Sequence, residues 1–331
     1  MARDADHREE ITMLYFVLSL LGGIALLTLG GEALVRSAVA GAERLGVSAL
    51  FTGLVIVGFG TSAPELVVSI NAALDQQPDI AIGNVVGSNI GNIMLILGLC
   101  ALIYPLTTKR QALKRDGLVM LAATLLFIVL GASGELGRLD ALLFLAGLVG
   151  YLVWAYLSER QTAPTQEPPN VLPEPPAQKP TSTLWIVLGL LGGLALLIGG
   201  SQFLLYGAVG IAQTLGLSEA VIGLTIVAVG TSLPELAVSL VAALRRHADV
   251  AVGNILGSNI FNLLGILGVS AFLQPLVLIE RMVIFDQWVM LGSAVALLVF
   301  LYTGLRLSRT EGGILLVGYA GFVAASFTLF G

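Results

Sequence analysis

Long apolar runs follow one another along almost the whole chain, separated by short segments rich in charge, Gly or Pro. About 20 apolar residues are enough for an α-helix to cross the hydrocarbon core of a bilayer. The pattern therefore predicts an all-α polytopic membrane protein with ten transmembrane helices, near residues 11–35, 47–74, 80–104, 115–132, 139–158, 183–207, 218–244, 250–273, 284–304 and 311–330.

One polar segment interrupts the series. Residues 164–180, "PTQEPPNVLPEPPAQKP", hold seven of the 12 prolines of the chain. Such a composition favours an extended or disordered linker. We therefore divide the chain into a first five-helix unit, 11–158, a Pro-rich linker, 159–182, and a second five-helix unit, 183–331.

The two units are copies of each other. Residues 53–98 and 223–268 align without a gap at an offset of 170, with 27 of 46 positions identical, and the same offset pairs Pro105 with Pro275. Because each unit has an odd number of spans, the second copy enters the membrane from the opposite side. The prediction is a pair of inverted repeats, an arrangement common in secondary transporters, whose binding sites lie near the midplane where the repeats meet.

Composition excludes several classes of protein. Only 11% of the residues are charged, against about 25% in soluble domains, and no basic stripe with aromatic residues suggests nucleic-acid binding. The single cysteine, Cys100, lies in an apolar run and is interpreted as a small buried hydrophobe. The first ten residues are acidic, unlike the start of a cleaved signal peptide, so we expect the first span to stay in the mature protein.

Lysine and arginine lie mostly on one side of the predicted topology. With ten spans, the odd-numbered loops hold 12 of the 16 basic residues, namely Arg36, Arg44, Lys109, Arg110, Lys114, Arg115, Arg160, Lys179, Arg245, Arg246, Arg306 and Arg309. Basic loops stay in the cytoplasm. This predicts a multi-pass protein of the cell membrane with a cytoplasmic linker and both termini outside.

A polar motif occurs inside the second and seventh spans, as "GTSAPE" at 60–65 and "GTSLPE" at 230–235. Both spans are too long for one straight crossing, and Pro64 and Pro234 predict a break in each. A break frees backbone carbonyls within the bilayer, where they need partners. Hydroxyl and carboxylate oxygens follow at once, and together these are the ligands of hard cations: Thr61, Ser62, Glu65, Thr231, Ser232 and Glu235.

A second motif occurs in the third and eighth spans, as "GNVVGSNIGN" at 83–92 and "GNILGSNIFN" at 253–262. Ser88 and Asn92 are four residues apart and share one helical face, as do Ser258 and Asn262. The glycines at 83, 87, 253 and 257 have the small-xxx-small spacing that lets helices approach closely. Each repeat therefore offers a broken helix packed against a glycine-faced helix with oxygen ligands.

Other polar residues have structural interpretations. Asn84, Asn89, Asn254 and Asn259 are expected to pair helices or satisfy backbone groups, Glu32 to lie at the interface, and Asp116 and Asp286 to cap their helices. The structural alternatives for the motif residues are a hydrogen bond from a protonated acid at Glu65 or Glu235, and back-bonding to a helical carbonyl at the Ser and Thr positions. An ionisable residue inside the membrane favours a functional interpretation of the two glutamates.

Two repeats with "GTSxPE" and "GNxxGSNxxN" resemble the cation/Ca²⁺ exchanger superfamily, in its prokaryotic sodium/calcium exchanger branch, over nearly the whole chain. The resemblance implies a ten-helix fold with four ion sites between the second, third, seventh and eighth helices, and first and sixth helices that slide to alternate access. It implies that Glu65 and Glu235, with the carbonyls of Thr61 and Thr231, hold Ca²⁺. It further implies Na⁺ ligands at Ser62, Ser232, Ser88 and Ser258 and at the carbonyls of Gly58 and Ala228.

The chain departs from this pattern at one place. Some members have Asp at the end of the second motif in the second repeat, whereas both matching positions here are asparagine, Asn92 and Asn262. Two carboxylates remain, which one Ca²⁺ or two Na⁺ neutralise, and a third Na⁺ would leave one positive charge. The expected cargo is Ca²⁺ and Na⁺, with no cofactor, nucleic acid or obligate protein partner.

Alternatives remain at this point. The nearest is a cation/H⁺ antiporter that uses the same glutamates, and a passive cation channel is a different class. Against an intramembrane enzyme, the spans contain no H-E-x-x-H motif and no paired catalytic aspartates, and His7 and His247 both lie outside the predicted core of the membrane.

Overall fold

The computed structural model describes residues 2–108, 110, 113–161, 182–215 and 230–330. Its first repeat begins with the long helix α1 and continues through helices that are interrupted by short π-helical stretches, labelled η. The elements are α1 (Ala2–Leu45), α2 (Ala49–Thr52), η1 (Gly53–Val57), α3 (Gly58–Thr61), α4 (Ala63–Leu74), α5 (Pro78–Gly91), η2 (Asn92–Leu97), α6 (Gly98–Ile103), β1 (Leu106–Thr107), η3 (Leu113–Gly117), α8 (Leu118–Gly131), β2 (Glu135–Leu136) and α9 (Arg138–Gln161).

The second repeat follows the same order. Its described elements are α10 (Thr183–Thr214), α13 (Leu233–Leu244), α14 (Ala248–Ile260), η5 (Phe261–Ile266), α15 (Leu267–Leu273), β3 (Leu276–Val277), η6 (Met282–Asp286), α16 (Gln287–Gly304), β4 (Arg306–Leu307) and α17 (Arg309–Phe330). Helix α4 and strand β1 recur in α13 and β3 at the offset of 170 that the sequence predicts.

Seven of the described helices are long and apolar enough to cross a membrane, or eight when the bent pair Ala49–Thr61 and Ala63–Leu74 is taken as one span. This confirms an all-α membrane protein. Of the two other predicted spans, 218–244 lies partly outside the described ranges, while 115–132 is described as η3 and α8 but is not among these helices. Helix α1 extends to Leu45, ten residues beyond the predicted end of the first span. The prediction stopped at the charged residues from Arg36 onward, but helical hydrogen bonds need no apolar side chains, so a helix can continue past the bilayer.

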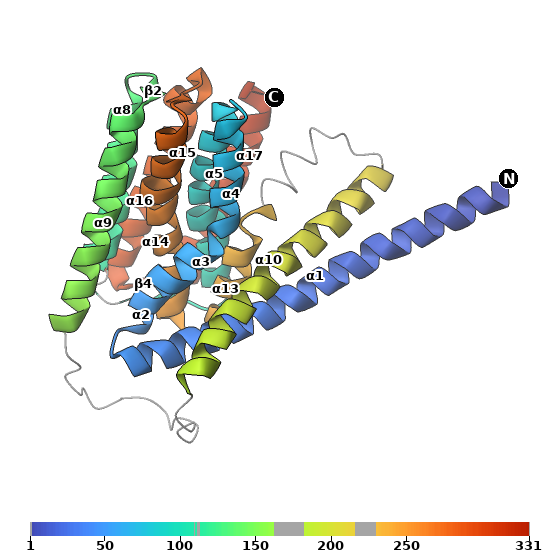
Figure 1. The fold of residues 1–331 in the computed structure, drawn as a ribbon, viewed down its shortest axis with the longest axis horizontal. Coiled ribbons are helices and arrows are strands. Elements are labelled where there is room, and N and C mark those ends of the chain that lie inside the picture. Colours follow the sequence, from blue (N-terminus) through green and yellow to red (C-terminus); the bar gives the residue numbers. More distant parts are fainter. Residues whose placement is uncertain (1, 109, 111–112, 162–181, 216–229, 331) are drawn as a thin grey trace.

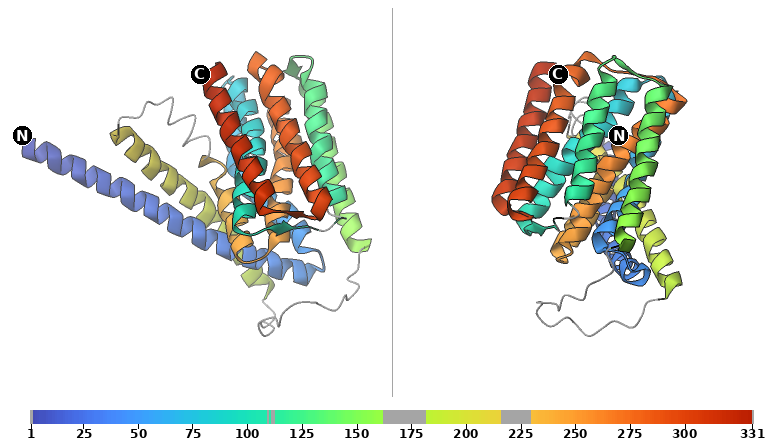
Figure 2. Two further views of the ribbon diagram at one scale, coloured as in Figure 1. Left: turned by 180° about the vertical axis from the view of Figure 1, so that it is seen from behind. Right: turned by 90° about the vertical axis from the view of Figure 1, so that its left-hand side faces the viewer.

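Helices α1 and α10 lie side by side and slope across the other helices, which stand roughly parallel to one another (Figures 1 and 2). Small residues line the contact between them. A Cβ atom on Gly30 would lie 2.8 Å from the carbonyl oxygen of Gly193, and one on Gly193 would lie 2.9 Å from that of Gly30. Since no side chain fits there, glycine lets the two backbones touch. The first and sixth predicted spans therefore form one closely packed pair.

Two short antiparallel strand pairs tie the repeats together. Strand β1 pairs with β4, with Leu106 opposite Leu307, and β2 pairs with β3, with Leu136 opposite Leu276. Each pair joins a loop of the first repeat to a loop of the second. In the predicted topology β1 and β4 lie in odd-numbered loops and β2 and β3 in even-numbered loops, so both pairings agree with the predicted sidedness.

Candidate cation site

The second predicted span is broken at Ser62, as the sequence predicts. The helical segments on either side of it differ in direction by 43°. Ser62 has φ −81° and ψ 9°, outside the helical range, and Pro64 then occupies the first turn of α4. Proline is favourable there because the first turn of a helix leaves its N–H groups unbonded in any case. The break places Glu65 in the first turn of α4, where it is 1% exposed.

The second repeat begins the matching helix in the same way. Ser232 precedes α13 with φ −87° and ψ 12°, Pro234 lies in the first turn, and Glu235 is 1% exposed. Residues 216–229 lie outside the described ranges, and so does the predicted ligand at Ala228. The described part of this motif, from Gly230 to Glu235, repeats the geometry of the first.

The serines and glutamates of the two motifs cross-link the repeats. The Ser62 hydroxyl donates a hydrogen bond of 2.9 Å to Oε1 of Glu235, and the Ser232 hydroxyl lies 3.3 Å from Oε1 of Glu65. Ser232 also lies 3.4 Å from the hydroxyl of Ser88. Each carboxylate is thus positioned by a hydroxyl from the other repeat. Ser62 and Glu235 lie 173 positions apart in sequence and Ser232 and Glu65 lie 167 apart, yet each pair meets across the repeat interface.

Asparagines from the second motif fix the glutamate backbones. Asn84 donates to the carbonyl oxygen of Glu65 at 3.2 Å and to the Ser69 hydroxyl at 2.9 Å. Asn254 makes the same two contacts in the second repeat, with Glu235 and Ser239 at 3.3 and 2.9 Å. The predicted backbone-satisfying role of these asparagines is confirmed. The sequence analysis did not single out the two serines, although both hold the same place after the glutamate, in "ELVVS" and "ELAVS".

Four asparagines meet where α5 and α14 face each other. The side-chain nitrogen of Asn92 donates to Oδ1 of Asn259 at 3.0 Å, and that of Asn262 donates to Oδ1 of Asn89 at 3.0 Å. Asn89 in turn donates to the backbone carbonyl of Asn259 at 3.3 Å. Because the amide nitrogens are used in these contacts, Asn92 and Asn262 keep their Oδ1 atoms for another partner. The two π-helical stretches η2 and η5 begin at this point, and such stretches often occur at functional sites.

Several oxygen atoms in this region are buried and have no hydrogen-bond partner. A buried polar atom without a partner is destabilising, so a group of them points to a missing ligand. All are acceptors, or hydroxyls able to act as acceptors, and therefore suit a cation: Oε2 of Glu65, Oε2 of Glu235, Oγ1 of Thr231, and Oδ1 of Asn92 and of Asn262. Among the described residues no group of three or more His, Cys, Asp or Glu side chains forms a metal site. A cation here would therefore be bound by two carboxylates and by neutral oxygens.

The remaining candidates in the described chain lie in the same place. The Ser258 hydroxyl donates to the carbonyl oxygen of Gly58 at 3.1 Å, and the Thr61 hydroxyl lies 3.3 Å from the same carbonyl and 3.2 Å from Oδ1 of Asn254. Among the described hydroxyl–carbonyl contacts of the two motifs, only that of Thr61 lies within its own helix. Helices α3 and α14 are closely packed here. A Cβ atom on Gly58 would lie only 2.8 Å from the carbonyl oxygen of Asn254, so the two backbones are in contact.

Comparison with known proteins identifies the family. The model of the sodium/calcium exchanger protein family matches the chain twice, at residues 15–157 and 185–328, once for each repeat. This chain belongs to the sodium/calcium exchanger family. It is 41% identical over 317 residues to the putative antiporter CaxA of Alkalimonas amylolytica, covering 94% of this chain and 98% of that protein. It is 34% identical to the sodium/calcium exchanger MaX1 of Methanosarcina acetivorans, with the same two coverages.

A solved structure agrees with the sequence relatives. The sodium–calcium exchanger NCX_Mj superposes with a TM-score of 0.82 at 31% sequence identity, covering 95% of this chain and 99% of that one. The resemblance drawn from the two motifs is therefore confirmed. The chain is a cation/Ca²⁺ exchanger, a membrane transporter and not an enzyme.

Cavities around the site differ in character. A small cavity of about 20 Å³ is lined by Ser88 and Ser232 among other residues, and a groove of about 340 Å³ runs from Asp79 to Gly87. Gly87 lines both, so the groove leads toward the serines.

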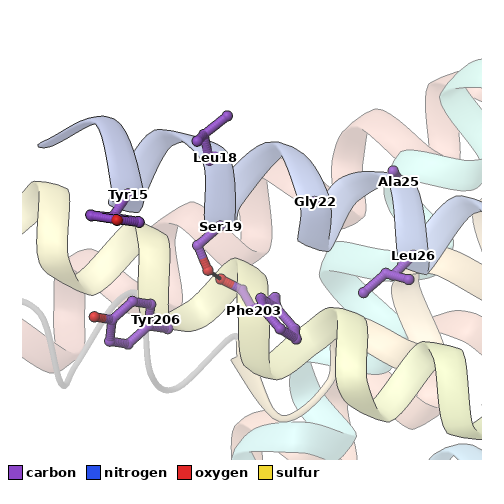
Figure 3. Close-up of a pocket in the computed structure, with 8 residues that line it drawn as sticks. All are labelled: Tyr15, Leu18, Ser19, Gly22, Ala25, Leu26, Phe203 and Tyr206. Carbon is purple, nitrogen blue, oxygen red and sulfur yellow. Dashed lines mark hydrogen bonds between the residues drawn. The ribbon is translucent and has the colours of Figure 1, made fainter. Parts of the chain in front are cut away.

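A larger cavity of about 620 Å³ lies between α1 and α10 and is shown in Figure 3, where the Ser19 hydroxyl donates to the backbone oxygen of Phe203. Its eight lining residues include no acid, so it does not resemble the cation site.

The capping prediction for two aspartates is wrong. Asp116 accepts hydrogen bonds from Arg115 at 2.7 Å and Tyr151 at 3.0 Å, and Asp286 accepts one from Arg281 at 2.9 Å. Both aspartates lie within continuous helical turns, where no N–H group is left to cap. Tertiary neighbours therefore bind these carboxylates. Sequence spacing could not identify Tyr151, 35 residues away, as a partner.

Glu32 lies in the last third of α1 and is partly buried, and its interfacial role stays a prediction. It forms ion pairs with Arg36, one turn further along α1, and with Arg245, which follows α13, the latter at 2.7 Å. The pair with Arg245 connects the α1–α10 pair to the helices that hold the site. The corresponding residue in the second repeat, Gln202, has no charge for such a contact.

Proposed function

We propose that this exchanger carries Na⁺ in one direction and Ca²⁺ in the other, by alternating access to one midplane site. The observation that carries the proposal is the pair of buried carboxylates, Glu65 and Glu235, one from each repeat. Each has one oxygen contacted by a serine of the other repeat and one oxygen without a partner. A pair of carboxylates surrounded by neutral oxygens suits a hard cation.

The proposed Ca²⁺ ligands are the carboxylates of Glu65 and Glu235 with the backbone carbonyls of Thr61 and Thr231. The unpartnered oxygens at both glutamates support this assignment. The proposed Na⁺ ligands are hydroxyl and carbonyl oxygens around the same acids, at Ser62, Ser88, Ser232, Ser258, Gly58 and Ala228. Asn92 and Asn262 are proposed to contribute their free Oδ1 atoms as neutral ligands in place of an acid.

Charge balance explains why the two ions would exclude each other. Two carboxylates carry a charge of −2, which one Ca²⁺ or two Na⁺ neutralise. Buried charge without compensation is strongly unfavourable, so Ca²⁺ and a full set of Na⁺ cannot share the site. Competition for the same acids couples the two flows. In the direction we propose, Na⁺ enters the cell down its gradient and Ca²⁺ leaves.

The relatives support sodium as the counter-ion. MaX1 is named a sodium/calcium exchanger, and NCX_Mj was solved after soaking with Na⁺ and Ca²⁺. The number of hydroxyls around the carboxylates supports it too, since a neutral oxygen ligand binds Na⁺ without adding negative charge. We further propose that the protein resides in the cell membrane with the linker in the cytoplasm.

Transport into proteoliposomes tests this function. Vesicles loaded with Na⁺, with K⁺ or with a proton gradient are diluted into ⁴⁵Ca²⁺, for the wild type and for Glu65→Gln. We expect uptake with internal Na⁺ alone, and its loss in the variant. Uptake driven by protons alone would instead assign the chain to cation/H⁺ antiport with the same glutamates. Uptake without any counter-ion and without saturation would indicate a channel.

A further inference from the structure

Another cavity is lined by three basic residues, and in the predicted topology it lies at the membrane face that carries most of the lysines and arginines. It has a volume of about 490 Å³ and is lined by Arg110, Lys114, Arg115, Trp154 and Ser158. These residues come from the start of the fourth predicted span and from the last turns of α9. The cavity thus lies between two helices at the level where a helix leaves the membrane.

Two of the three basic residues form no ion pair with a described carboxylate. Arg115 is buried and forms ion pairs with Asp116 at 2.7 Å and with Glu159 at 2.9 Å, so its charge is already compensated. Arg110 and Lys114 are exposed, and no carboxylate among the described residues pairs with either. The three basic groups and the two carboxylates that pair with Arg115 leave one net positive charge. The cavity therefore attracts an anion.

Aromatic rings border the same region. The Trp154 side chain is 50% exposed, and the Arg110 guanidinium lies over the ring of Tyr302, 5.9 Å from its centre. Exposed Trp and Tyr side chains are typical of the zone between acyl chains and headgroups. A ligand that fits here has an anionic head beside Arg110 and Lys114, and an apolar part that runs past Trp154 into the bilayer.

The second repeat has different residues at the positions that match these basic side chains. At the offset of 170, Glu280, Ile284 and Phe285 replace the three basic residues. Helix α9 begins at Arg138 and α17 at Arg309, an offset of 171, which places Ala325 and Leu329 in the positions of Trp154 and Ser158. Duplication alone would have kept the residues on both sides. Because the repeats are inverted, the basic version faces only one leaflet, the one predicted to be cytoplasmic.

We propose that this cavity binds the phosphate headgroup of an anionic phospholipid in the cytoplasmic leaflet. Anionic lipids are concentrated in that leaflet, and basic pockets between transmembrane helices on that side bind phosphorylated headgroups. A free phosphate ion offers the same charge but no apolar part to contact Trp154. The lipid is therefore the source of phosphate that the cavity fits.

The bound headgroup would lie next to a link to α1. Glu159, which pairs with Arg115, also accepts a hydrogen bond of 3.0 Å from the backbone N–H of Ser48. Ser48 caps the start of α2, two residues after Gly46, whose φ of 65° marks the turn out of α1. A lipid at Arg110 and Lys114 would thus contact the group of charges that holds this turn in place.

Fluorescence of Trp154 tests lipid binding without any transport measurement. The chain has three tryptophans, so Trp185→Phe with Trp288→Phe leaves Trp154 as the reporter. The purified protein is reconstituted in phosphatidylcholine with brominated phosphatidylglycerol or brominated phosphatidylcholine at equal mole fraction. We expect the anionic lipid to quench Trp154 more strongly. Arg110→Gln and Lys114→Gln should each lower this preference about fivefold, the usual effect of one basic residue at an anionic surface.

Matched controls come from the same chain. Arg246→Gln removes one exposed charge from the same membrane face and should leave the preference intact, and Trp288 as the only tryptophan, in the second repeat, should show none. Equal quenching of Trp154 by both lipids, or a preference that survives the double variant Arg110→Gln/Lys114→Gln, would overturn the proposal. If inorganic phosphate alters Trp154 fluorescence while the anionic lipid shows no preference, the cavity binds a free anion and the lipid assignment is wrong.

Discussion

Ser62 of the first repeat donates a hydrogen bond of 2.9 Å to Glu235 of the second, and Ser232 contacts Glu65 in the reciprocal arrangement at 3.3 Å. Neither glutamate is therefore positioned by its own repeat alone. Any movement of one repeat against the other changes the surroundings of both carboxylates together. A site divided in this way can couple the binding of a cation to the relative position of the two halves.

Neutralising either glutamate should abolish exchange. Glu65→Gln or Glu235→Gln lowers the charge of the site from −2 to −1, so a bound Ca²⁺ would be left with an uncompensated buried charge. Loss of one partner from a buried ion pair costs about 3 kcal/mol, or about 100-fold in affinity. Calcium titration and ⁴⁵Ca²⁺ uptake measure this. The control, Glu43→Gln, alters an exposed carboxylate on α1 and should behave as the wild type. Equal loss in the control would indicate a general effect of charge.

Removing a serine hydroxyl should affect sodium more than calcium. Ser62→Ala deletes the donor to Glu235 and a neutral oxygen that we assign to Na⁺, while both carboxylates remain for Ca²⁺. A hydrogen bond to a charged group contributes about 1.5 kcal/mol or more, so the half-saturating Na⁺ concentration should rise about tenfold. Ser293→Ala serves as the control, since Ser293 is also buried but bonds only to the Met290 carbonyl. A larger shift for Ca²⁺ than for Na⁺ would contradict the assignment.

The contact between α1 and α10 should tolerate no side chain at its glycines. Gly30→Ala or Gly193→Ala would place a Cβ atom within 2.8 Å of a backbone atom in the facing helix. Overpacking of this kind costs about 1–3 kcal/mol, and thermal unfolding in detergent should show a lower midpoint. Gly22→Ala on α1 and Gly192→Ala on α10 are controls on the same two helices, at positions where a Cβ atom meets nothing within 4 Å. If all four variants unfold alike, close packing does not hold the two helices together.

Loss of the aspartate at 116 should destabilise the fold more than loss of its repeat partner. Asp116 is fully buried between Arg115 and Tyr151, so Asp116→Leu leaves a buried guanidinium with Glu159 as its only remaining carboxylate. We expect a loss of about 3 kcal/mol in the free energy of unfolding. The matched variant Asp286→Leu frees Arg281, whose side chain is 29% exposed and remains hydrated, so a smaller loss is expected. Thermal unfolding of both variants measures the two losses of stability. An equal or larger loss for Asp286→Leu would contradict the role assigned to burial.

Labelling from the two sides of the membrane tests the proposed orientation. Cys100 is buried and is the only cysteine, so Cys100→Ala provides a background without thiols. In that background Ser182→Cys, at the end of the linker, should react with an impermeant maleimide only after the membrane is made permeable to the reagent. Ser133→Cys, in an exposed loop of the opposite face, should react in intact cells. The reverse pattern would place the linker outside.

Much of the fold could be predicted because the chain is duplicated, so that one half of the sequence can be compared with the other. The offset of 170 identified both motifs, and polar residues retained at membrane depth indicated a cation site around Glu65 and Glu235. The break at Ser62 followed from Pro64, since the chemistry of proline is local. Helix ends were harder to predict, because the charged end of α1 stays helical to Leu45.

Contacts between distant residues could not be predicted from the sequence. The capping role expected of Asp116 was wrong because Tyr151 and Arg115 compete for its carboxylate, and nothing in the spacing shows that α9 lies close to η3. The contacts of the Asn92 and Asn262 side chains also became clear only in the structure. Their nitrogens bond to Asn259 and Asn89 of the opposite repeat, which leaves the oxygens free.

By itself the sequence determined the membrane class, the two inverted copies and the oxygen-rich chemistry of each half-site. These properties depend on hydropathy, on repetition and on local backbone rules, all of which can be read along one chain. The tertiary structure alone decided which half-site meets which, that each carboxylate is contacted by a serine of the other repeat, and that Arg110 and Lys114 line one cavity with Trp154. Those properties depend on which helices pack together, and packing brings together residues that lie 170 positions apart.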